Sequence, residues 1–417
     1  MRYIIEGGKP IKGKIKISGS KNSALAIIAA SLILKNKTIL RNVPDIEDIN
    51  IMIKIANSLG SKTSFFNNTL TIYPFIKNNS YQKELCSKIR SSLYFLAPLL
   101  SYNDKIILNQ PGGCGFGSRP IDFHLNILRK LGATVNEKEE FILIEKTKLT
   151  GTNITLPYPS FGATVNFLLL SLIADSPSSI KNYAKEPEIF DLINFLKIAG
   201  ADIIFNQDKI TIMPLNQQAE TIDYTIMPDR IEAFTFLTAT ALTNGEIEIQ
   251  NCNPEHLQFP LKILKEFGYD PIINSNSIYI NCSNNRYDRL NQIDVTTSPY
   301  PGFPTDLQPI ITPLLAKSKK SSKITDAVFK ERFVHISEFK KFGINYSLNK
   351  NTITLSPSIF QSSKVSCPDI RAGAALVLVA LASPGISEIS NIEKIQRGYE
   401  NFDKKLSSLG AEISLTN

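Results

Sequence analysis

The sequence is poor in residues that bind metals or form disulfides. Its three histidines, His124, His256 and His335, have no cysteine or histidine partner at the spacing of a zinc site. Its five cysteines are odd in number and lie far apart, which indicates a reducing compartment rather than a disulfide framework. We therefore expect a cytoplasmic protein with no metal ion and no cofactor.

Long apolar runs and basic patches are also scarce. The longest apolar runs, residues 24–34, 167–174 and 372–382, are shorter than the roughly 18–20 residues that a membrane span needs. The amino terminus lacks the apolar core and cleavage site of a signal peptide. The net charge of +8 is modest for 417 residues, and no basic run is interleaved with aromatic residues. These absences argue against membrane insertion and nucleic-acid binding, whereas the positive balance suits a small anionic substrate.

An internal repeat organises the chain. A glycine that follows an amphipathic helical pattern recurs at intervals of 67 to 75 residues, at Gly60, Gly132, Gly200, Gly268, Gly343 and Gly410. Each glycine is expected to cap its helix in the left-handed conformation. Short β-branched runs follow, at residues 69–72, 141–144, 210–212 and 352–355. A second, almost wholly apolar helix is expected half a period earlier, at residues 23–34, 92–100, 163–174, 233–242, 307–315 and 372–382.

The repeat predicts the fold class. A chain of 417 residues is too long for one ordinary core, so two domains are expected. We predict an α/β fold of six repeated βαββαβ-type units, three per domain. The apolar helices would lie inside, and the sheets and amphipathic helices outside, which describes a two-domain inside-out α/β barrel.

Residues 110–120, Gln-Pro-Gly-Gly-Cys-Gly-Phe-Gly-Ser-Arg-Pro, form the most informative segment. Its glycines allow the backbone to approach a ligand closely. Arg119 lies near enough in sequence to Cys114 to favour the thiolate, the reactive form of cysteine. The segment is therefore a candidate for a reactive loop. The alternative is a flexible hairpin with an incidental thiol.

The starts of the apolar helices carry polar or charged residues at the same phase of every repeat. Three of these starts include a cation: Lys21, Arg90 and Arg371. A cation opposes the positive end of the helix dipole, whereas a bound anion would be favoured there. The pattern therefore indicates anionic ligands. The alternative is ordinary N-capping by Ser, Asp and Asn.

Several motifs, in order along the whole chain, resemble the enolpyruvyl transferase family. They are Ile-Ser-Gly-Ser-Lys-Asn (17–22), the loop 111–120, Ser-Phe-Gly-Ala-Thr (160–164), Pro-Gly-Phe-Pro-Thr-Asp-Leu-Gln (301–308), Asp-Ile-Arg-Ala-Gly (369–373) and Ile-Gln-Arg-Gly-Tyr-Glu (395–400). The resemblance implies a domain 21–229, with a lid loop 110–120 and nucleotide-sugar contacts. It implies a second, discontinuous domain, 1–20 plus 230–417, with Asp306 and Arg397. We expect a monomer.

The resemblance also implies the chemistry. The enolpyruvyl group of phosphoenolpyruvate would pass to the 3-hydroxyl of UDP-N-acetylglucosamine by addition and elimination, with release of phosphate. This is the first committed step of peptidoglycan synthesis, on which cell shape and division depend. Cys114 would protonate the methylene carbon or assist product release, and would be alkylated by the epoxide fosfomycin. Asp306 would be the general base; the alternative for Asp306 is an N-cap.

The resemblance assigns further residues to the two substrates. Lys21, Arg119 and Arg397 would hold the phosphate and carboxylate of phosphoenolpyruvate. The catalytic residues would be Cys114, Asp306, Lys21 and Arg397. The full substrate-binding set is Lys21, Asn22, Arg90, Arg119, Pro120, Asp122, His124, Ser160, Phe161, Gly162, Asp306, Val328, Arg332, Asp369, Arg371 and Arg397.

Two other functions remain open. One is an enolpyruvyl transferase for shikimate 3-phosphate, although residues 86–90 read Cys-Ser-Lys-Ile-Arg and do not resemble the Gly-Asn-Ala-Gly-Thr run of that enzyme. The other is a catalytically silent paralogue that only binds ligands. The chain departs from the family pattern at Tyr158, Glu47, Glu331 and Tyr94, where relatives often carry lysine, a basic residue, asparagine and tryptophan. These departures bear on nucleotide affinity and leave the reacting centre unchanged.

Overall fold

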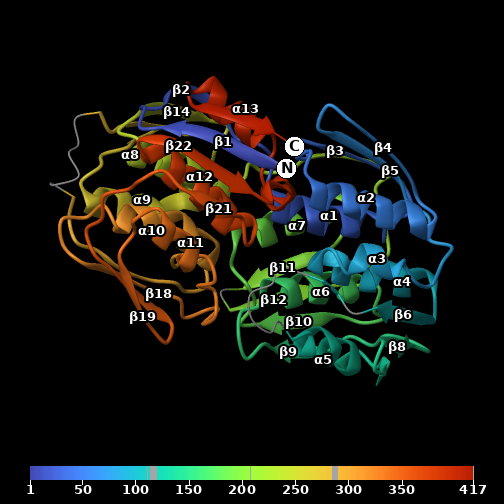
Figure 1. The fold of residues 1–417 in the computed structure, drawn as a ribbon. Helices are drawn as coiled ribbons and strands as arrows, with labels where there is room; N and C mark the ends of the chain where they lie inside the picture. Colours follow the sequence, from blue (N-terminus) through green and yellow to red (C-terminus); the bar gives the residue numbers. More distant parts are fainter. Residues whose placement is uncertain (110, 113–119, 207, 284–289, 417) are drawn as a thin grey trace. The chain divides into compact units, whose positions relative to one another are not determined.

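The computed structural model describes residues 1–109, 111–112, 120–206, 208–283 and 290–416, which form two compact units (Figure 1). The middle unit comprises the described residues between Gly19 and Met227. The terminal unit comprises those between Met1 and Ser18 and those from Pro228 onward. The chain passes from one unit to the other after Ser18 and again after Met227.

Three sheets form among the described strands of the middle unit. Their orders are β13 (Thr221–Thr225), β3 (Lys37–Arg41), β5 (Thr69–Tyr73), β4 (Lys62–Phe66); β11 (Ile203–Asn206), β12 (Lys209–Ile212), β10 (Ser178–Lys181), β9 (Asn153–Thr155); and β6 (Lys105–Asn109), β8 (Phe141–Glu145), β7 (Thr134–Glu137). Each four-stranded sheet has one parallel edge pair, β13–β3 or β9–β10. The three-stranded sheet is antiparallel throughout.

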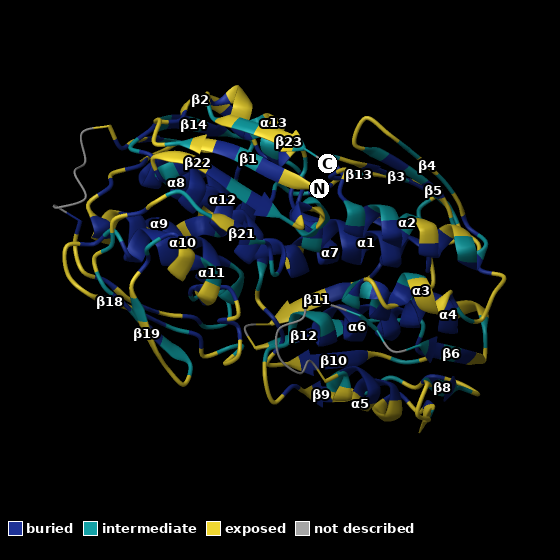
Figure 2. Ribbon diagram, in the orientation of Figure 1, coloured by how far each residue is buried: buried dark blue, intermediate teal, exposed yellow. Residues whose placement is uncertain are grey.

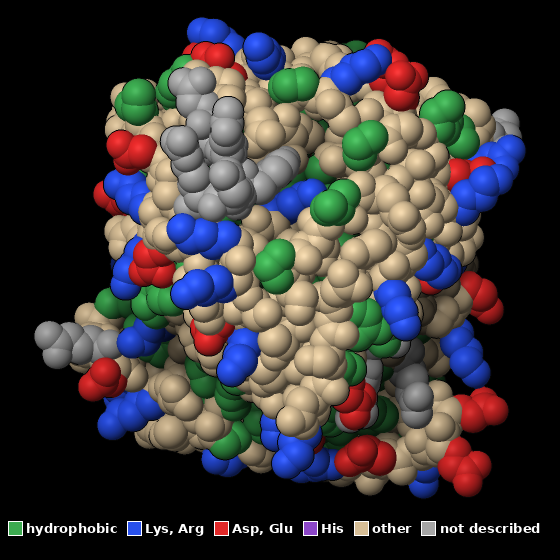
Figure 3. All heavy atoms as spheres, turned by 60° about the vertical axis from the view of Figure 1, so that its left-hand side comes forward, with side chains coloured by type: hydrophobic (Ala, Val, Ile, Leu, Met, Phe, Trp, Pro, Cys, Tyr) green, Lys and Arg blue, Asp and Glu red, His purple; other side chains and the backbone are tan. Residues whose placement is uncertain are grey.

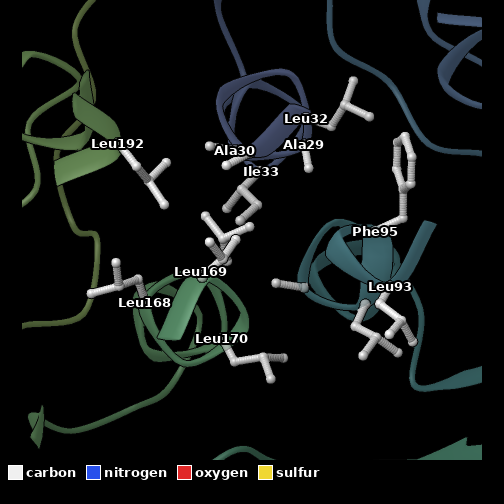
Figure 4. Close-up of a cluster of buried hydrophobic side chains, with 14 of the residues drawn as sticks. Ala29, Ala30, Leu32, Ile33, Leu93, Phe95, Leu168, Leu169, Leu170 and Leu192 are labelled. Carbon is white, nitrogen blue, oxygen red and sulfur yellow. The ribbon is translucent and has the colours of Figure 1, made fainter. Parts of the chain in front are cut away.

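Apolar helices fill the core of the middle unit. The innermost are α1 (Lys21–Ser31), the 3-10 helix η1 (Arg90–Phe95) with α4 (Leu96–Tyr102), and α6 (Phe161–Leu172). In Figure 4, Ile33, just after α1, and Leu169 of α6 point toward each other, and Leu192 of α7 and Leu93 of η1 belong to the same buried cluster. The helices α2 (Glu47–Leu59), α5 (Asp122–Lys130) and α7 (Pro187–Ile198) bury one face each, and α3 (Lys83–Cys86) is a single turn.

The terminal unit repeats this plan. Its described sheets are β15 (Ile272–Ile273), β16 (Ser277–Asn281), β14 (Glu246–Gln250), β2 (Lys12–Lys16); β17 (Asp294–Thr296), β18 (Ser322–Thr325), β20 (Thr352–Leu355), β19 (Tyr346–Asn349); and β21 (Lys364–Ser366), β22 (Gly385–Ser390), β1 (Arg2–Gly7), β23 (Glu412–Thr416). The helices α8 (Arg230–Leu242), α10 (Gln308–Leu315) and α12 (Ile370–Ala382) contact one another and are buried (Figure 2). The other helical segments among the described residues of this unit are η2 (Pro254–Leu257), α9 (Gln258–Phe267), η4 (Thr305–Leu307), α11 (Ile336–Lys341), η5 (Ile392–Arg397) and α13 (Phe402–Ser408).

Two of the expected apolar helices begin with a tighter turn. The segment expected as a helix at 92–100 is 3-10 up to Phe95 and α-helical only from Leu96, and η4 precedes α10 in the same way. Proline explains both breaks, because Pro98 and Pro309 lie in the first turn of their α-helices. A proline ring clashes with the carbonyl four residues earlier, so the α-helix cannot extend further toward the amino terminus.

The predicted glycine caps are confirmed, because all six glycines have positive φ, between 85° and 123°. The predicted strand order within each repeat is wrong. The chain runs strand–helix–strand–helix–strand–strand, with one strand between the two helices. The two strands after five of the capped helices pair as local hairpins, whereas β23, which follows Gly410, pairs with β1. Between β4 and β5, for example, Asn67 and Asn68 both have positive φ. Such two-residue turns suit hairpins, and they place both strands after the glycine.

Candidate active site

Asp306 lies in the first turn of η4, with its carboxylate between two arginines. Its Oδ1 is 2.7 Å from Nη1 of Arg332, and its Oδ2 is 3.6 Å from Nε of Arg371. The N-cap of η4 is Pro304, and no side chain caps this turn. The N-cap alternative for Asp306 is therefore wrong: the structure uses this carboxylate to bind guanidinium groups.

Burial differs within this cluster of three. The side chains of Arg332 and Arg371 are 3% and 5% exposed, whereas that of Asp306 is 32% exposed. Two buried cations favour the ionised carboxylate, and the remaining exposure leaves it open to a ligand. The arrangement can accept a proton from a hydroxyl group that approaches Asp306.

The start of α12 supports Arg371. Asp369 is the N-cap, and its Oδ1 accepts hydrogen bonds of 2.9 Å from the backbone nitrogens of Arg371 and Ala372. The guanidinium of Arg371 lies over the ring of Tyr399, 5.1 Å from its centre. Arg397 ends η5, two residues before that tyrosine. The terminal unit thus brings Asp306, Arg332, Asp369 and Arg371 together.

In the middle unit, Lys21 forms a buried salt bridge. Lys21 is the first residue of α1, and its Nζ is 2.6 Å from Oδ2 of Asp48 in α2, with side-chain exposures of 9% and 6%. Asn22 follows in the first turn and is half-buried. The salt bridge fixes the ammonium group of Lys21 at the start of α1.

A second cluster in the middle unit joins Arg90, Pro120 and His124. Nη2 of Arg90 donates to the Pro120 carbonyl at 2.7 Å. The Asn166 amide nitrogen lies 2.6 Å from Nδ1 of His124. Burial, together with the nearby charge of Arg90, lowers the pKa of His124 to about 3, so the ring is neutral at pH 7. With Nδ1 accepting from the Asn166 amide, the ring proton is on Nε2.

The start of α6 lies against this histidine. Ser160 caps α6 by accepting a hydrogen bond from the Ala163 nitrogen at 3.4 Å. A Cβ at Gly162 would lie 3.2 Å from Cε1 of His124, which is tighter than ordinary van der Waals contact, so a larger residue would push against the ring. Phe161 packs against the core. The structure therefore brings together His124, Ser160, Phe161 and Gly162, whereas Asp122 is exposed at the start of α5.

Cys114, Arg119 and most of the predicted lid loop 110–120 lie outside the described residues. The four described cysteines, Cys86, Cys252, Cys282 and Cys367, are buried. Burial raises the pKa of Cys252 to about 11 and that of Cys282 to about 12, so these two thiols are unreactive at pH 7.

The described residues contain no cluster of three metal-ligating side chains. They also contain no helix long and apolar enough to span a membrane. On the face drawn in Figure 3, lysine and arginine side chains are dispersed among acidic ones.

Sequence reasoning missed the partners of the candidate site residues. Asp48, Asn166 and Tyr399 hold Lys21, His124 and Arg371, respectively. Asp48 belongs to an acidic first turn, and Asn166 is a polar residue in an apolar helix. Both are unusual in their context, but the sequence does not show which residue they contact.

The comparisons with known proteins agree with the fold. The family model described as EPSP synthase (3-phosphoshikimate 1-carboxyvinyltransferase) matches residues 5–406. The enolpyruvyl transferase NikO from Streptomyces tendae has a similar structure, with a TM-score of 0.90 at 23% identity over 99% of this chain and 98% of NikO. An EPSP synthase from Acinetobacter baumannii aligns with a TM-score of 0.76 at 18% identity over 99% and 100%. These two likenesses establish the α/β fold with mixed sheets.

The chain belongs to this family of carboxyvinyl (enolpyruvyl) transferases, and it is an enzyme of that class. Its curated relatives include UDP-N-acetylglucosamine 1-carboxyvinyltransferase from Halothermothrix orenii, 38% identical over 99% of both chains. UDP-N-acetylglucosamine 1-carboxyvinyltransferase 1 from Carboxydothermus hydrogenoformans is 40% identical over 100% of this chain and 98% of the relative.

Proposed function

We propose that the protein transfers the enolpyruvyl group of phosphoenolpyruvate to the 3-hydroxyl of UDP-N-acetylglucosamine and releases phosphate. The observation that carries this proposal is the full-length similarity, at 38–40% identity, to relatives named for that activity. Their names favour the nucleotide sugar over shikimate 3-phosphate as the acceptor. In the cell the reaction would be the cytoplasmic first committed step of peptidoglycan synthesis, which supports cell shape and division.

In the addition step, Asp306 takes the proton of the sugar 3-hydroxyl while the hydroxyl oxygen forms a bond to C2 of phosphoenolpyruvate. The electron pair of the C2–C3 double bond takes up a proton at C3, and we assign Cys114 as the donor of this proton. The structural support for Asp306 is its exposed carboxylate, held by Arg332 at 2.7 Å. A positioned base of this kind typically contributes a factor of roughly 10²–10⁴ to the rate.

In the elimination step, C3 returns a proton to the Cys114 thiolate, the double bond re-forms, and the bond between C2 and the phosphate oxygen breaks. Lys21, Arg119, Arg371 and Arg397 would hold the phosphate and carboxylate groups. Several cations are needed because a small polyanion loses its hydration when it binds. Val328 and Asn22 would contact the sugar.

The nucleotide diphosphate would bind at the start of α6. Backbone N–H groups at Phe161 and Gly162 lie at the positive end of this helix, where phosphate is favoured, whereas the Ser160 N–H donates to the Tyr158 carbonyl at 2.7 Å, so Ser160 would offer its side chain. Nε2–H of neutral His124 is a further donor, and Arg90, Pro120, Arg119 and Asp122 complete the proposed set. The proposed domains are 21–229, with the lid loop 110–120, and 1–20 plus 230–417. The architecture would be a two-domain inside-out α/β barrel of six repeats, and the protein would be a monomer without a cofactor.

The decisive experiment measures phosphate release from phosphoenolpyruvate with UDP-N-acetylglucosamine, with shikimate 3-phosphate, and with neither acceptor. We expect release that depends on the nucleotide sugar. Release only with shikimate 3-phosphate would assign the protein to the other branch of the family. No release with either acceptor would favour a silent paralogue.

Alkylation by fosfomycin tests the role of Cys114. We expect an adduct on Cys114 under saturating UDP-N-acetylglucosamine, detected by peptide mass spectrometry, and none in the Cys114→Ser variant. The serine variant should also lose nearly all turnover, because its hydroxyl is a far weaker acid than the thiol. Near-normal turnover of Cys114→Ser would remove this cysteine from the mechanism.

A further inference from the structure

Asp326 is a fully buried carboxylate that directly follows β18, in the terminal unit. Its Oδ1 accepts hydrogen bonds from Oγ1 of Thr297 at 2.8 Å and from the backbone nitrogens of Val328 and Phe329 at 3.0 and 2.8 Å. Its Oδ2 accepts a hydrogen bond from Oγ1 of Thr305 at 2.7 Å. Asp326 thus joins the end of β17, the turn η4 and the segment that leads to Arg332.

The hydroxyl of Thr305 has a fixed direction. It carries one proton, and that proton goes to Asp326, so the oxygen lone pairs of Thr305 remain for another donor. Nη1 of Arg332 lies 3.2 Å from this oxygen and 2.7 Å from Oδ1 of Asp306. The same guanidinium nitrogen is therefore held by Thr305 and by Asp306.

We propose that Asp326, acting through Thr305, is a positioning residue that sets Arg332 against the carboxylate of Asp306. The inference rests on the proposed function, because it gives Asp306 the role of base. It goes further in naming a residue, 20 positions away in the sequence from Asp306, that controls the charge beside it.

The chemistry of Asp326 makes the proposal specific. Only a carboxylate can accept hydrogen bonds on both of its oxygens; an asparagine would place an N–H₂ group toward one of its partners. With that group toward Thr305, the hydroxyl would turn and donate elsewhere, and two donors would then face each other between Thr305 and Arg332. We expect Asp326→Asn to push Arg332 away from Asp306.

The experiment compares Thr305→Val with Thr297→Val. Both variants remove one hydroxyl that donates to Asp326, but only Thr305 also contacts Arg332. For each we would measure kcat/KM for nucleotide-sugar-dependent phosphate release across pH, together with the unfolding midpoint in urea. A structural role alone would lower stability in both and leave the shape of the pH profile unchanged.

We expect Thr305→Val to lower kcat/KM roughly tenfold or more, since a misplacement of about 1 Å can cost a hundredfold. The acidic limb of its kcat/KM profile should move up by about one pH unit, because a carboxylate that loses a neighbouring cation is more easily protonated. Asp326→Asn should behave in the same way. Thr305→Ser, which keeps the hydroxyl, should have the same acidic limb as the wild type. Thr297→Val should also have the wild-type acidic limb.

An unchanged limb in Thr305→Val, or equal shifts in Thr305→Val and Thr297→Val, would overturn the inference and leave the proposed function standing. A wild-type enzyme without nucleotide-sugar-dependent release would instead overturn the proposed function. A crystal structure of Thr305→Val gives a readout independent of turnover: Arg332 still 2.7 Å from Asp306 would overturn the positioning role in either case.

Discussion

The two units start their buried helices with different chemistry. In the terminal unit, α8 and α12 begin at carboxylate caps, Asp229 and Asp369, each of which accepts two backbone hydrogen bonds. In the middle unit, α1 and α6 begin at hydroxyl caps, Ser20 and Ser160, each accepting one. A carboxylate offsets the positive end of the helix dipole, whereas a neutral hydroxyl leaves it available to an anion.

The cations at the helix starts have partners within the protein, which bears on the anion sites predicted from the sequence. Asp48 pairs with Lys21, the Pro120 carbonyl accepts from Arg90, and Asp306 lies beside Arg371. A bound anion would therefore share each of these cations with its partner. The neutral caps of α1 and α6, with no acidic residue in the first turn, also favour an anion.

The largest expected effect comes from replacing Asp306, the carboxylate of the terminal unit that does not cap its helix. Asp306→Asn should lower kcat for phosphate release about a thousandfold, because an amide cannot take the proton of the 3-hydroxyl. The matched control is Asp294→Asn in β17. The exposed carboxylate of Asp294 accepts a hydrogen bond from the backbone nitrogen of Lys323. Steady-state kinetics that show equal losses in both variants would argue against a base at Asp306.

The second largest effect is expected from breaking the buried salt bridge between Lys21 and Asp48 in the middle unit. Lys21→Met leaves Asp48 buried without its partner, which should lower the free energy of unfolding by about 3 kcal/mol. Adding Asp48→Asn should recover most of that loss, because no uncompensated charge remains. Urea unfolding of the two variants measures the difference, and equal stabilities would show that Asp48 finds another partner.

The caps can be exchanged directly. Ser160→Asp gives α6 the anionic start of the terminal unit, which should stabilise the fold by about 0.5 kcal/mol. It should also raise KM for UDP-N-acetylglucosamine about tenfold, a loss of about 1.4 kcal/mol, by repelling the diphosphate. Ser160→Asn, a neutral cap, is the control. An unchanged KM in Ser160→Asp would place the nucleotide elsewhere.

The remaining prediction concerns the pH dependence of stability, which is gradual and appears only below neutral pH. In the folded protein the pKa of His124 falls from its ordinary value of 6.5 to about 3, so between these values the unfolded chain binds the extra proton. The stability contributed by the neutral ring is full above pH 6.5 and is lost as pH falls toward 3. His124→Gln should flatten the slope of unfolding free energy by about 1 kcal/mol per pH unit near pH 5. Urea titrations at several pH values would detect it; an unchanged slope would mean that His124 is protonated in the fold.

Local signals carried much of the fold prediction. Glycine caps, apolar helices and β-branched runs report on their own neighbourhood, and strands such as β20 (Thr352–Leu355) fall where the pattern placed them. The order of strands within the repeat was wrong, because a single apolar run does not reveal which run it pairs with. The family resemblance named Asp306 and Arg332. Their support by Asp326 and Thr305 depends on hydrogen bonds between residues 21 and 27 positions apart, which no sequence periodicity reveals.

The central place of β1 in its sheet has a consequence for synthesis. β1 pairs with β22 and β23, so Arg2 lies opposite Ser390 and Thr416, near the other end of the chain (Figure 1). All the described strands of the middle unit come from residues 37–225, and that unit can therefore form while the ribosome is still translating. Strand β1 therefore keeps both edges unpaired until β22 and β23 have been synthesised. A chain truncated before β22 leaves these edges and the buried side chains of β1 exposed, which favours aggregation.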